Sequence, residues 1–485
     1  MGREVELKLE IAPGEVKRLR RQPALAAAQP REQKQLSVYF DTPGMKLRKS
    51  GLVLRVRQVG NSFVQTVKAE GLFDRPEWEA PVAELRPEPQ AASGTPVAGL
   101  LGTRGFAKLR PVVRSDVRRT RWVVEHNGTR IEVALDEGEV QGGGGEQAIS
   151  EVELELLDGE PGAIFGLARE LTAHVSLRLG VLSKAERGFA LANGELGRVT
   201  KAPPLELDST MTAGEGFTAI ALSCLRHFLL NEPLVVEHRD PSALHQMRVA
   251  MRRLRSAFSL FAPMIRDDRA FLPLREELRW FTSQLGEARN LDVFLKQPDL
   301  GPAERVKLEA ARERQYDAIL AVLDSHRLRS LVLDLAAWLL TGEWRDRRRA
   351  SKPLASFTSK RIDRLWDDIE IRGGDLASLD EEPRHRLRID IKKIRYALEF
   401  VAGLHRGAGQ RQKQFGAALE GLQESLGHLN DMATAREIAA AHLDAAGEGA
   451  AIRAPDEEAR HLAEAADHFA RLEKVGAYWR APAER

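Results

Sequence analysis

The sequence has little cysteine, few aromatic residues and no long apolar run. Its one cysteine, Cys224, excludes an intramolecular disulfide and any zinc site built from several cysteines. No segment approaches the roughly 18 consecutive apolar residues that a membrane-spanning helix needs. The N-terminal stretch has no apolar core of the signal-peptide kind. We therefore expect a cytoplasmic protein without membrane contact.

Charge is plentiful but balanced. The 73 basic and 71 acidic residues leave a net charge of +2, which by itself does not indicate a polyanionic partner. The distribution is uneven, however. Acidic pairs lie in strand-like stretches of the first 200 residues, whereas basic residues lie in helix-like stretches of the remainder. The charge pattern therefore favours two parts with different roles.

A chain of 485 residues is too long for one ordinary core, so two or three domains are expected. Residues 1–195 read as an α+β domain with many short strands. Residues 196–207 lose periodicity and contain Pro203-Pro204, which indicates a linker. Residues 208–485 read as helix with short breaks and predict an all-α domain.

The strands of residues 1–195 are separated by turn signals such as VGNS, EHNGT and EVQGGGGEQ, which are typical of hairpins. About eight strands with antiparallel connections favour a closed antiparallel barrel or tunnel over an open sheet. A helix is expected from Pro161 to about Leu179, because apolar residues recur there at helical spacing.

These strands carry charged side chains on one face. The first, EVELKLEI, alternates apolar residues with Glu4, Glu6 and Lys8. Further same-face groups are Arg55 with Arg57, Thr66 with Lys68, Glu77 with Glu79, Glu132 with Asp136, and Glu151 with Glu153 and Glu155. For any one strand a solvated outer face is the simpler interpretation. Recurrence on every strand favours a barrel with a polar interior, whose apolar side chains face covering helices.

Such an interior suits phosphoryl transfer. Carboxylates two residues apart on a strand can bind Mg²⁺ or Mn²⁺ through oxygen. Pairs of Arg and Lys hold phosphate oxygens, bidentately in the case of Arg. A metal, cationic side chains and an oriented water together are the groups that phosphoryl transfer uses.

The same segments resemble the CYTH family, the triphosphate tunnel metalloenzymes. The resemblance runs in order through the E-x-E-x-K of Glu4, Glu6 and Lys8, then YFDT, LRVR, TVKA, EWE, VALDEGEV, SEVELEL and LSKAERGFAL. It covers nearly all of residues 1–192. It implies an eight-stranded antiparallel tunnel that hydrolyses or cyclises triphosphate-bearing substrates with a divalent cation.

The resemblance also implies roles for individual residues. Catalytic roles fall to Glu4, Glu6, Glu153 and Lys184; metal binding, of Mg²⁺ or Mn²⁺, to Glu4, Glu6, Asp136, Glu151 and Glu153; substrate binding to Lys8, Arg55, Arg57, Lys68 and Arg119. Arg121 shares the strand face of Arg119 and is an alternative to it. Glu155 could lie outside the tunnel.

The helical half contains an internal repeat. HQMRVAMRRLRSAFSLF begins at His245 and HRLRIDIKKIRYALEFV at His385, an offset of 385 − 245 = 140. LGEARNLD at Leu285 is echoed by LGHLNDMA at Leu426, an offset of 141. Two matched pairs at nearly one offset predict two related helical bundles with pseudo-twofold symmetry.

Each repeat carries a row of basic residues on one helix face, at spacings of 3, 4 and 3. The rows are His245, Arg248, Arg252 and Arg255, and His385, Arg388, Lys392 and Arg395. A solvated basic face is the simpler interpretation of one row. We expect the rows to lack acids at i+4, so their repetition favours a polyanionic partner. The two histidines could instead bind a metal, but the neighbouring cations would repel it.

This half resembles the CHAD domain, a helical module associated with CYTH proteins and polyphosphate, over about residues 208–480. The resemblance implies that long-chain polyphosphate is bound by His245, Arg248, Arg252, Arg253, Arg255, Arg289, His385, Arg388, Lys392, Lys393 and Arg395.

Both halves together predict a metal-dependent inorganic triphosphatase that hydrolyses tripolyphosphate to diphosphate and phosphate, with a helical domain that binds polyphosphate. Its expected location is the cytoplasm, with polyphosphate granules as a candidate site. Thiamine-triphosphatase and adenylate cyclase activity remain alternatives, as does a non-catalytic granule protein. A nucleic-acid partner is a weaker hypothesis, because the basic rows lack interleaved aromatic residues for stacking bases.

Overall fold

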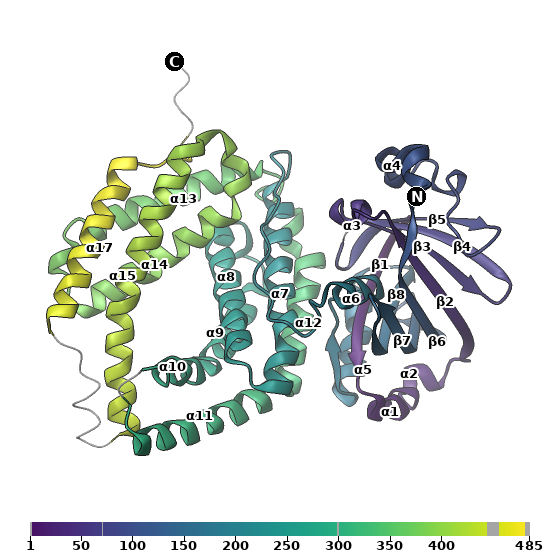
Figure 1. The fold of residues 1–485 in the computed structure, drawn as a ribbon, viewed down its shortest axis with the longest axis horizontal. Helices are drawn as coiled ribbons and strands as arrows, with labels where there is room; N and C mark the ends of the chain where they lie inside the picture. Colours follow the sequence, from purple (N-terminus) through teal and green to yellow (C-terminus); the bar gives the residue numbers. More distant parts are fainter. Residues whose placement is uncertain (1, 70, 298–299, 444–454, 481–485) are drawn as a thin grey trace. The chain divides into compact units, whose positions relative to one another are not determined.

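The computed structural model describes residues 2–69, 71–297, 300–443 and 455–480 (Figure 1). The chain forms two compact units. The first comprises Met1–Arg198 and Asp324–Ala337, and the second comprises Val199–Leu323 and Trp338–Arg485.

The first unit is built on one antiparallel sheet of nine strands in the order β5-β4-β3-β2-β6-β7-β8-β1-β9. The strands are β1 (Gly2–Ile11), β2 (Arg31–Asp41), β3 (Leu52–Val59), β4 (Ser62–Ala69), β5 (Asp74–Val82), β6 (Arg110–His126), β7 (Thr129–Gly142), β8 (Gly145–Asp158) and β9 (Leu177–Leu179). Four residues of β1, Gly2–Val5, also pair with β5.

The antiparallel sheet is confirmed, but the predicted count of eight strands is wrong. Helix α5 (Gly162–His174) ends earlier than the sequence predicted, and Leu177–Leu179 forms the ninth strand beside β1. Leu177 and Leu179 are both buried, so this short segment follows a period of two rather than the helical period. The predicted closure into an eight-stranded tunnel is not shown by this strand order and stays a prediction.

Both faces of β1 are buried. On the apolar face Leu7 and Leu9 are at most 1% exposed, and on the charged face Glu6 is only 9% exposed. A solvated charged face would leave Glu6 open to water. The simpler interpretation of the charged pattern is therefore wrong for this strand.

Short helices cover the apolar side of the sheet. They are α1 (Val16–Arg20), α2 (Pro23–Ala26), α3 (Lys46–Lys49), α4 (Pro96–Phe106) and α5, with the 3₁₀ segments η1 (Pro13–Glu15) and η2 (Gln90–Ala92). Helix α6 (Lys184–Asn193) is different, because its Phe189 belongs to a cluster with Tyr39 and Val140 on the charged side. On the apolar side, Leu101 and Phe106 of α4 belong to one cluster with Leu54 of β3 and Val67 of β4. This packing leaves the opposite side of the sheet to the charged residues.

Helices make up nearly all regular structure in the described part of the second unit. They are α7 (Ala213–His238), α8 (Pro241–Ile265), α9 (Phe271–Gln284), α10 (Gly286–Phe294), α11 (Pro302–Leu323), the end of α12 (His326–Thr341), α13 (Leu354–Gly373), α14 (Glu381–Phe400), α15 (Gly409–His442) and α17 (Pro455–Val475), with η3 (Glu343–Asp346), η4 (Leu376–Ser378) and η5 (Ala402–Ala408). The all-helical prediction for this half is confirmed.

The two repeated motifs lie at equivalent positions of two helices. His245 follows the start of α8 by 245 − 241 = 4 residues, and His385 follows the start of α14 by 385 − 381 = 4 residues. Helices α8 and α14 pack against one another. The repeat therefore brings two basic rows onto neighbouring helices.

Helix α7 is, among the described residues, the one helix long and apolar enough to cross a membrane. It has 26 residues and a most apolar window of mean hydropathy 1.3, and 61% of that window is buried inside the structure. Phe217 packs edge-on against Phe258 of α8, and Phe228 packs against Phe281 of α9. These contacts are those of a core helix in a bundle, so its hydropathy is weak evidence for a membrane span.

The segment predicted to be a linker has no regular structure from 199 to 208. It is nevertheless fixed to α7 at one point. The Thr200 N–H donates to the Asn231 side-chain oxygen at 3.0 Å, and the Asn231 amide donates back to the Thr200 carbonyl at 2.9 Å.

Candidate active site and basic helical face

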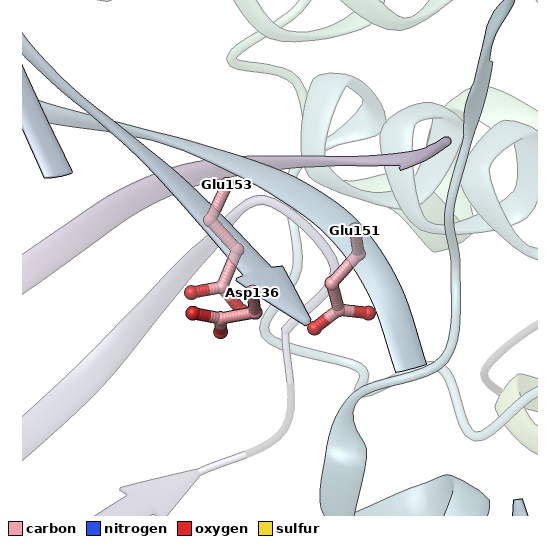
Figure 2. Close-up of side chains that lie close together, drawn as sticks. All are labelled: Asp136, Glu151 and Glu153. Atoms are coloured by element: carbon pink, nitrogen blue, oxygen red, sulfur yellow. The ribbon is translucent and has the colours of Figure 1, made fainter. Parts of the chain in front are cut away.

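Three carboxylates, two of them buried and one partly buried, lie together on neighbouring strands of the sheet. Asp136 comes from β7, and Glu151 and Glu153 come from β8; one oxygen of each lies within 4.8 Å of the others (Figure 2). The register explains the arrangement, because Asp136 pairs across the ladder with Glu151, and Glu153 follows two residues later on the same face. We call these three residues the acidic cluster.

Lys184 contacts every member of the acidic cluster. Its Nζ lies 2.6 Å from Asp136 Oδ2 and 3.0 Å from Glu153 Oε1, and it donates to Glu151 Oε1. One ammonium group thus joins three carboxylates that would otherwise repel one another at short range.

Two further cations contact the acidic cluster from other strands. Arg119 of β6 binds Asp136 bidentately, with Nε to Oδ1 at 2.7 Å and Nη2 to Oδ2 at 2.6 Å, and it also contacts Glu153. Lys8 of β1 lies 3.3 Å from Glu153 Oε1. The structure therefore places Arg119 at the cluster, whereas its alternative, Arg121, pairs with Glu132 at 3.4 Å.

The carboxylates of the acidic cluster and the cations around them stabilise one another's charged forms. Burial alone would raise the pKa of the Asp136 and Glu153 carboxyls, but Lys184 and Arg119 outweigh burial and lower both pKa values, that of Glu153 well below its usual range. Burial would likewise lower the pKa of Lys184 and of Arg119, but the facing carboxylates raise both. The site is a buried network of opposite charges rather than a set of neutral acids.

Lys184 is the first residue of α6, so the position of this helix places its side chain. Ser183 caps this helix, accepting from the Glu186 N–H at 3.2 Å, while the Glu186 carboxylate accepts from the Ser183 N–H at 2.7 Å. A Cβ on Gly188 would overlap Val113, and one on Gly142 would overlap the Gly188 carbonyl. Two glycines therefore let α6 lie directly on β6 and β7, which fixes where Lys184 points.

A second charged group lies on β3, β4 and β5. Lys68 Nζ is 3.1 Å from Glu77 Oε1, and Arg55 Nη2 is 3.8 Å from the same oxygen. Arg55 also donates to Thr66 Oγ1 at 3.4 Å, and Thr66 donates to Glu79 at 2.9 Å. The structure thus gives Lys68 and Arg55 acidic partners of their own, Glu77 in particular, which the sequence analysis did not assign a role.

Arg57 differs from these cations. In the part of the chain that the structure describes, no carboxylate pairs with it, and its buried Nε has no hydrogen-bond partner. Burial, Arg55 and Arg119 together lower the pKa of Arg57 to about 10. A guanidinium surrounded by burial and like charge is unfavourable unless an anion binds beside it.

Glu6 lies beside the acidic cluster rather than in it. Its carboxylate accepts from Arg75 Nη2 at 2.6 Å and from Lys8 Nζ at 3.2 Å. Lys8 therefore links Glu6 to Glu153. Glu4 lies on β1, but its side chain falls outside the described residues, so its predicted catalytic and metal-binding roles stay predictions.

The helical unit holds a basic face, which we define as His245, Arg248, Arg252, Arg289, Arg388 and Lys392. Arg252 of α8 acts electrostatically on each of the other five. Burial, Arg289 and Arg252 lower the pKa of His245 to about 4. Burial, Arg388 and Arg252 lower the pKa of Lys392 to about 7. The row on α8 and the row on α14 therefore act on one another electrostatically.

Two models of known families match the chain. The CYTH domain model matches residues 2–189, and the CHAD domain model matches residues 219–440. The chain is a CYTH domain fused to a CHAD domain.

Several known proteins are similar to parts of this chain. Over 168 residues the chain is 33% identical to the inorganic triphosphatase of Haemophilus influenzae; the match covers 32% of this chain and 46% of that protein, less than half of its length. The CHAD domain of the plant Ricinus communis is 32% identical, with a TM-score of 0.47, over 59% of this chain and 97% of that one. The Hippeastrum protein HpAC1, described as having a dominant triphosphatase activity, is 19% identical, with a TM-score of 0.31, over 40% and 97%.

The donor set of the CYTH domain fits a hard divalent cation. Carboxylate oxygens are the ligands that Mg²⁺ and Mn²⁺ prefer, and the acidic cluster supplies three that converge. Asp136, Glu151 and Glu153 are the residues that would hold it.

The structure adds residues of the CYTH domain that the sequence analysis missed. Tyr39 pairs with Arg55 across the β2–β3 ladder; burial would raise its pKa, but Arg55 and Lys184 lower it. Arg187, one turn after Lys184 on α6, contacts Glu10. Tyr39 lies in the YFDT segment and Arg187 follows Lys184 at helical spacing, so both had a sequence signal; Arg75 had none.

Several predicted residues of the CHAD domain lie outside the basic face. Arg253 is buried, pairs with Glu399 and lies over the Phe400 ring, with its Cζ 5.2 Å from the ring centroid. Lys393 Nζ contacts Asp390 at 2.8 Å. Each follows a basic-face residue by one position, and one step turns a side chain about 100° around the helix.

The ends of the two rows also differ from the prediction. Arg255 is exposed and its cationic neighbours are Arg279 and Arg275 of α9. Arg395 pairs with Glu399 at 3.8 Å, so the expected absence of an acid at i+4 is wrong there. His385 is exposed, and its Nδ1 lies 3.2 Å from Asn430 Oδ1, which also accepts from Arg388 at 2.8 Å.

Proposed function

We propose that this protein is a metal-dependent inorganic triphosphatase that hydrolyses tripolyphosphate to diphosphate and phosphate. The observation that carries the proposal is that one sheet face holds both the acidic cluster and Arg57, a half-buried cation that has no carboxylate partner among the described residues. A site for phosphate binding alone would have no use for three converging carboxylates. The similarity to the Haemophilus influenzae enzyme supports the same reaction.

The side chains divide the work between metal and substrate. A divalent cation at the acidic cluster supplies charge neutralisation at the phosphate oxygens and lowers the pKa of a bound water. Arg57, Arg55 and Lys68 hold phosphate oxygens by charge-assisted hydrogen bonds. Lys184 and Arg119 keep the carboxylates ionised and oriented. The curved sheet acts in this proposal as a tunnel around the substrate.

The CHAD domain in this proposal binds long-chain polyphosphate along the basic face. A linear polyanion would neutralise the repulsion among Arg248, Arg252 and Arg388, which the described residues leave largely uncompensated. Such binding would place the protein at polyphosphate granules in the cytoplasm.

A panel of substrates tests the activity. Phosphate release is measured from tripolyphosphate, ATP, thiamine triphosphate and long-chain polyphosphate, with Mg²⁺, Mn²⁺ or a chelator. We expect tripolyphosphate to give the highest kcat/KM and the chelator to abolish it. A preference for thiamine triphosphate would identify a thiamine-triphosphatase instead. Formation of cyclic AMP from ATP would identify an adenylate cyclase. Absence of hydrolysis from all four would identify a binding protein.

Glu6→Gln is expected to lower tripolyphosphate hydrolysis at saturating metal by at least about 100-fold. Glutamine keeps the shape of the side chain but loses the charge that Arg75 and Lys8 contact. The melting temperature and circular dichroism spectrum should stay close to those of the unmodified protein. Turnover within a few-fold of the original would remove Glu6 from the catalytic set.

Polyphosphate affinity is expected to weaken as the pH rises above about 7. Lys392 faces Arg388 and Arg395 of α14, Arg252 of α8 and Asp431 of α15, and burial with these cations lowers its pKa to about 7. A bound polyanion favours the protonated amine, so binding takes up a proton above that pH and loses at most about tenfold in affinity per pH unit. Lys392→Arg should remove this dependence, because arginine stays charged. Anisotropy of labelled polyphosphate between pH 6 and 9 measures both; equal slopes would contradict the assignment.

A further inference from the structure

A basic pocket lies at the C-terminal end of α8. Its volume is about 450 Å³, and it is lined by Met264, Asp267, Arg347, Arg348, Arg349 and Lys352, so that four cations face one carboxylate. Met264 follows His245 by 264 − 245 = 19 residues of the same helix, a rise of about 28 Å. The basic pocket is therefore separate from the basic face.

Two of its arginines are held by the end of α8. Arg349 Nη1 donates to the Pro263 carbonyl at 2.7 Å, and Arg347 Nη2 donates to the Asp267 carbonyl at 2.8 Å. The last carbonyls of a helix lack intrahelical partners and attract cations. Each guanidinium has five N–H donors, so these contacts fix its position and leave other donors for a ligand.

Helix capping does not account for the other two cations. The side chains of Arg348 and Lys352 are exposed, and among the described residues neither has a hydrogen-bond or ion-pair partner. The carboxylate of Asp267 is shared, because Arg266 Nε lies 3.6 Å from its Oδ1. Arg361 of α13 lies close enough to Arg266 for the two cations to act on one another. The pocket thus has a surplus of positive charge that the described residues do not neutralise.

We propose that the basic pocket is a second anion site of the CHAD domain and binds a short run of linked phosphates. Guanidinium groups bind phosphate oxygens bidentately, and four cations around one pocket match a ligand of high charge density. No aromatic side chain lines the described pocket, so it offers no surface on which a nucleotide base would stack.

The phosphates come either from free tripolyphosphate or from the end of a long chain that the basic face also holds. This choice of anion rests on the proposed function, whereas the surplus of charge in the pocket does not. In the second case the basic face and the pocket would act as linked sites and raise the overall affinity for a long chain.

A reporter at the pocket separates this site from the others. Ser351 is exposed beside Arg348, and the native Cys224 is buried, so Ser351→Cys in the full chain can be labelled selectively with an environment-sensitive dye. The labelled protein is titrated with tripolyphosphate and with long-chain polyphosphate in the presence of a chelator. Arg348→Ala with Lys352→Ala removes the two unpartnered cations. The control is Arg104→Ala with Lys108→Ala, which has the same residue types and spacing at exposed positions of the CYTH domain.

We expect saturation of the dye signal, at least tenfold weaker binding in the Arg348→Ala, Lys352→Ala variant, and no change in the control. Saturation by tripolyphosphate identifies the free anion. Saturation by long chains alone, lost when Arg252→Ala and Lys392→Ala are introduced, identifies a chain end. If the dye signal does not saturate, or if the variant and the control bind with equal affinity, the proposal that this pocket binds linked phosphates is wrong. A failure of the proposed function would appear separately, as absent hydrolysis with an unchanged reporter.

Discussion

Glu153→Gln is expected to lower kcat for tripolyphosphate hydrolysis by about 10³-fold. Glu153 is the one member of the acidic cluster in contact with Lys8, Arg119 and Lys184 among the described residues. The substitution therefore removes a proposed metal ligand and the carboxylate that three cations share. Steady-state kinetics over a range of Mg²⁺ concentrations measures the loss, which saturating metal should not restore.

The same variant should be less stable. Three buried cations would face two carboxylates, and removing one partner of a buried ion pair costs roughly 3 kcal/mol of unfolding free energy. Glu125→Gln is the matched control, because Glu125 is an exposed glutamate on β6. It should change neither kcat nor the denaturation midpoint. If Glu153→Gln retained kcat within tenfold, the acidic cluster would not be the centre of the reaction.

Arg252→Ala is expected to lower the affinity of the CHAD domain for long-chain polyphosphate at least tenfold and to reduce the salt slope by about one. At pH 8 the loss should exceed that of Lys392→Ala, although the two positions are equivalent in the repeat. The pKa of Lys392 is lowered to about 7, so much of its charge is already absent in the free protein at pH 8. At pH 6 the two losses should converge.

Arg314→Ala is the control for this comparison. Arg314 is exposed on α11, and its substitution removes the same single positive charge. Anisotropy titrations at several salt concentrations give affinity and slope together. Equal losses for Arg252→Ala and Lys392→Ala at both pH values would contradict the charge state assigned to Lys392. If the salt slope of Arg252→Ala is unchanged, the assignment of polyphosphate binding to the basic face is wrong.

Alternation along single strands predicted the composition of the site better than its geometry. A period of two placed Glu151 and Glu153 on one face of their strand and Asp136 with Glu132 on one face of another, and the resemblance to the CYTH family implied that Asp136, Glu151 and Glu153 bind metal. Which cation contacts them depends on strand order, which no single strand encodes. Arg75 reaches Glu6 only because β5 pairs with the start of β1.

Helical periodicity had a similar limit in the CHAD domain. Helical spacing predicted the rows through Arg252 and Lys392. The same spacing places Arg253 and Lys393 on a different side of each helix, but the sequence analysis did not use it to exclude them. The basic pocket gave no such signal. Arg347, Arg348 and Arg349 lie in an irregular segment between α12 and α13, where no period indicates which way a side chain points.

The chain leaves the CYTH domain through the helix that bears Lys184. Helix α6 ends at Asn193, and residues 194–212 run from it to α7. Gly142 and Gly188 let the backbone of α6 pack directly against the backbone of β7. Because this contact is close-packed, we expect α6 to move away from β7 as one rigid unit. Tension on residues 194–212 would therefore reach the helix that holds an ammonium group against three carboxylates. Glu195, whose carboxylate accepts from Arg48 at 3.1 Å, lies between and would carry part of that load.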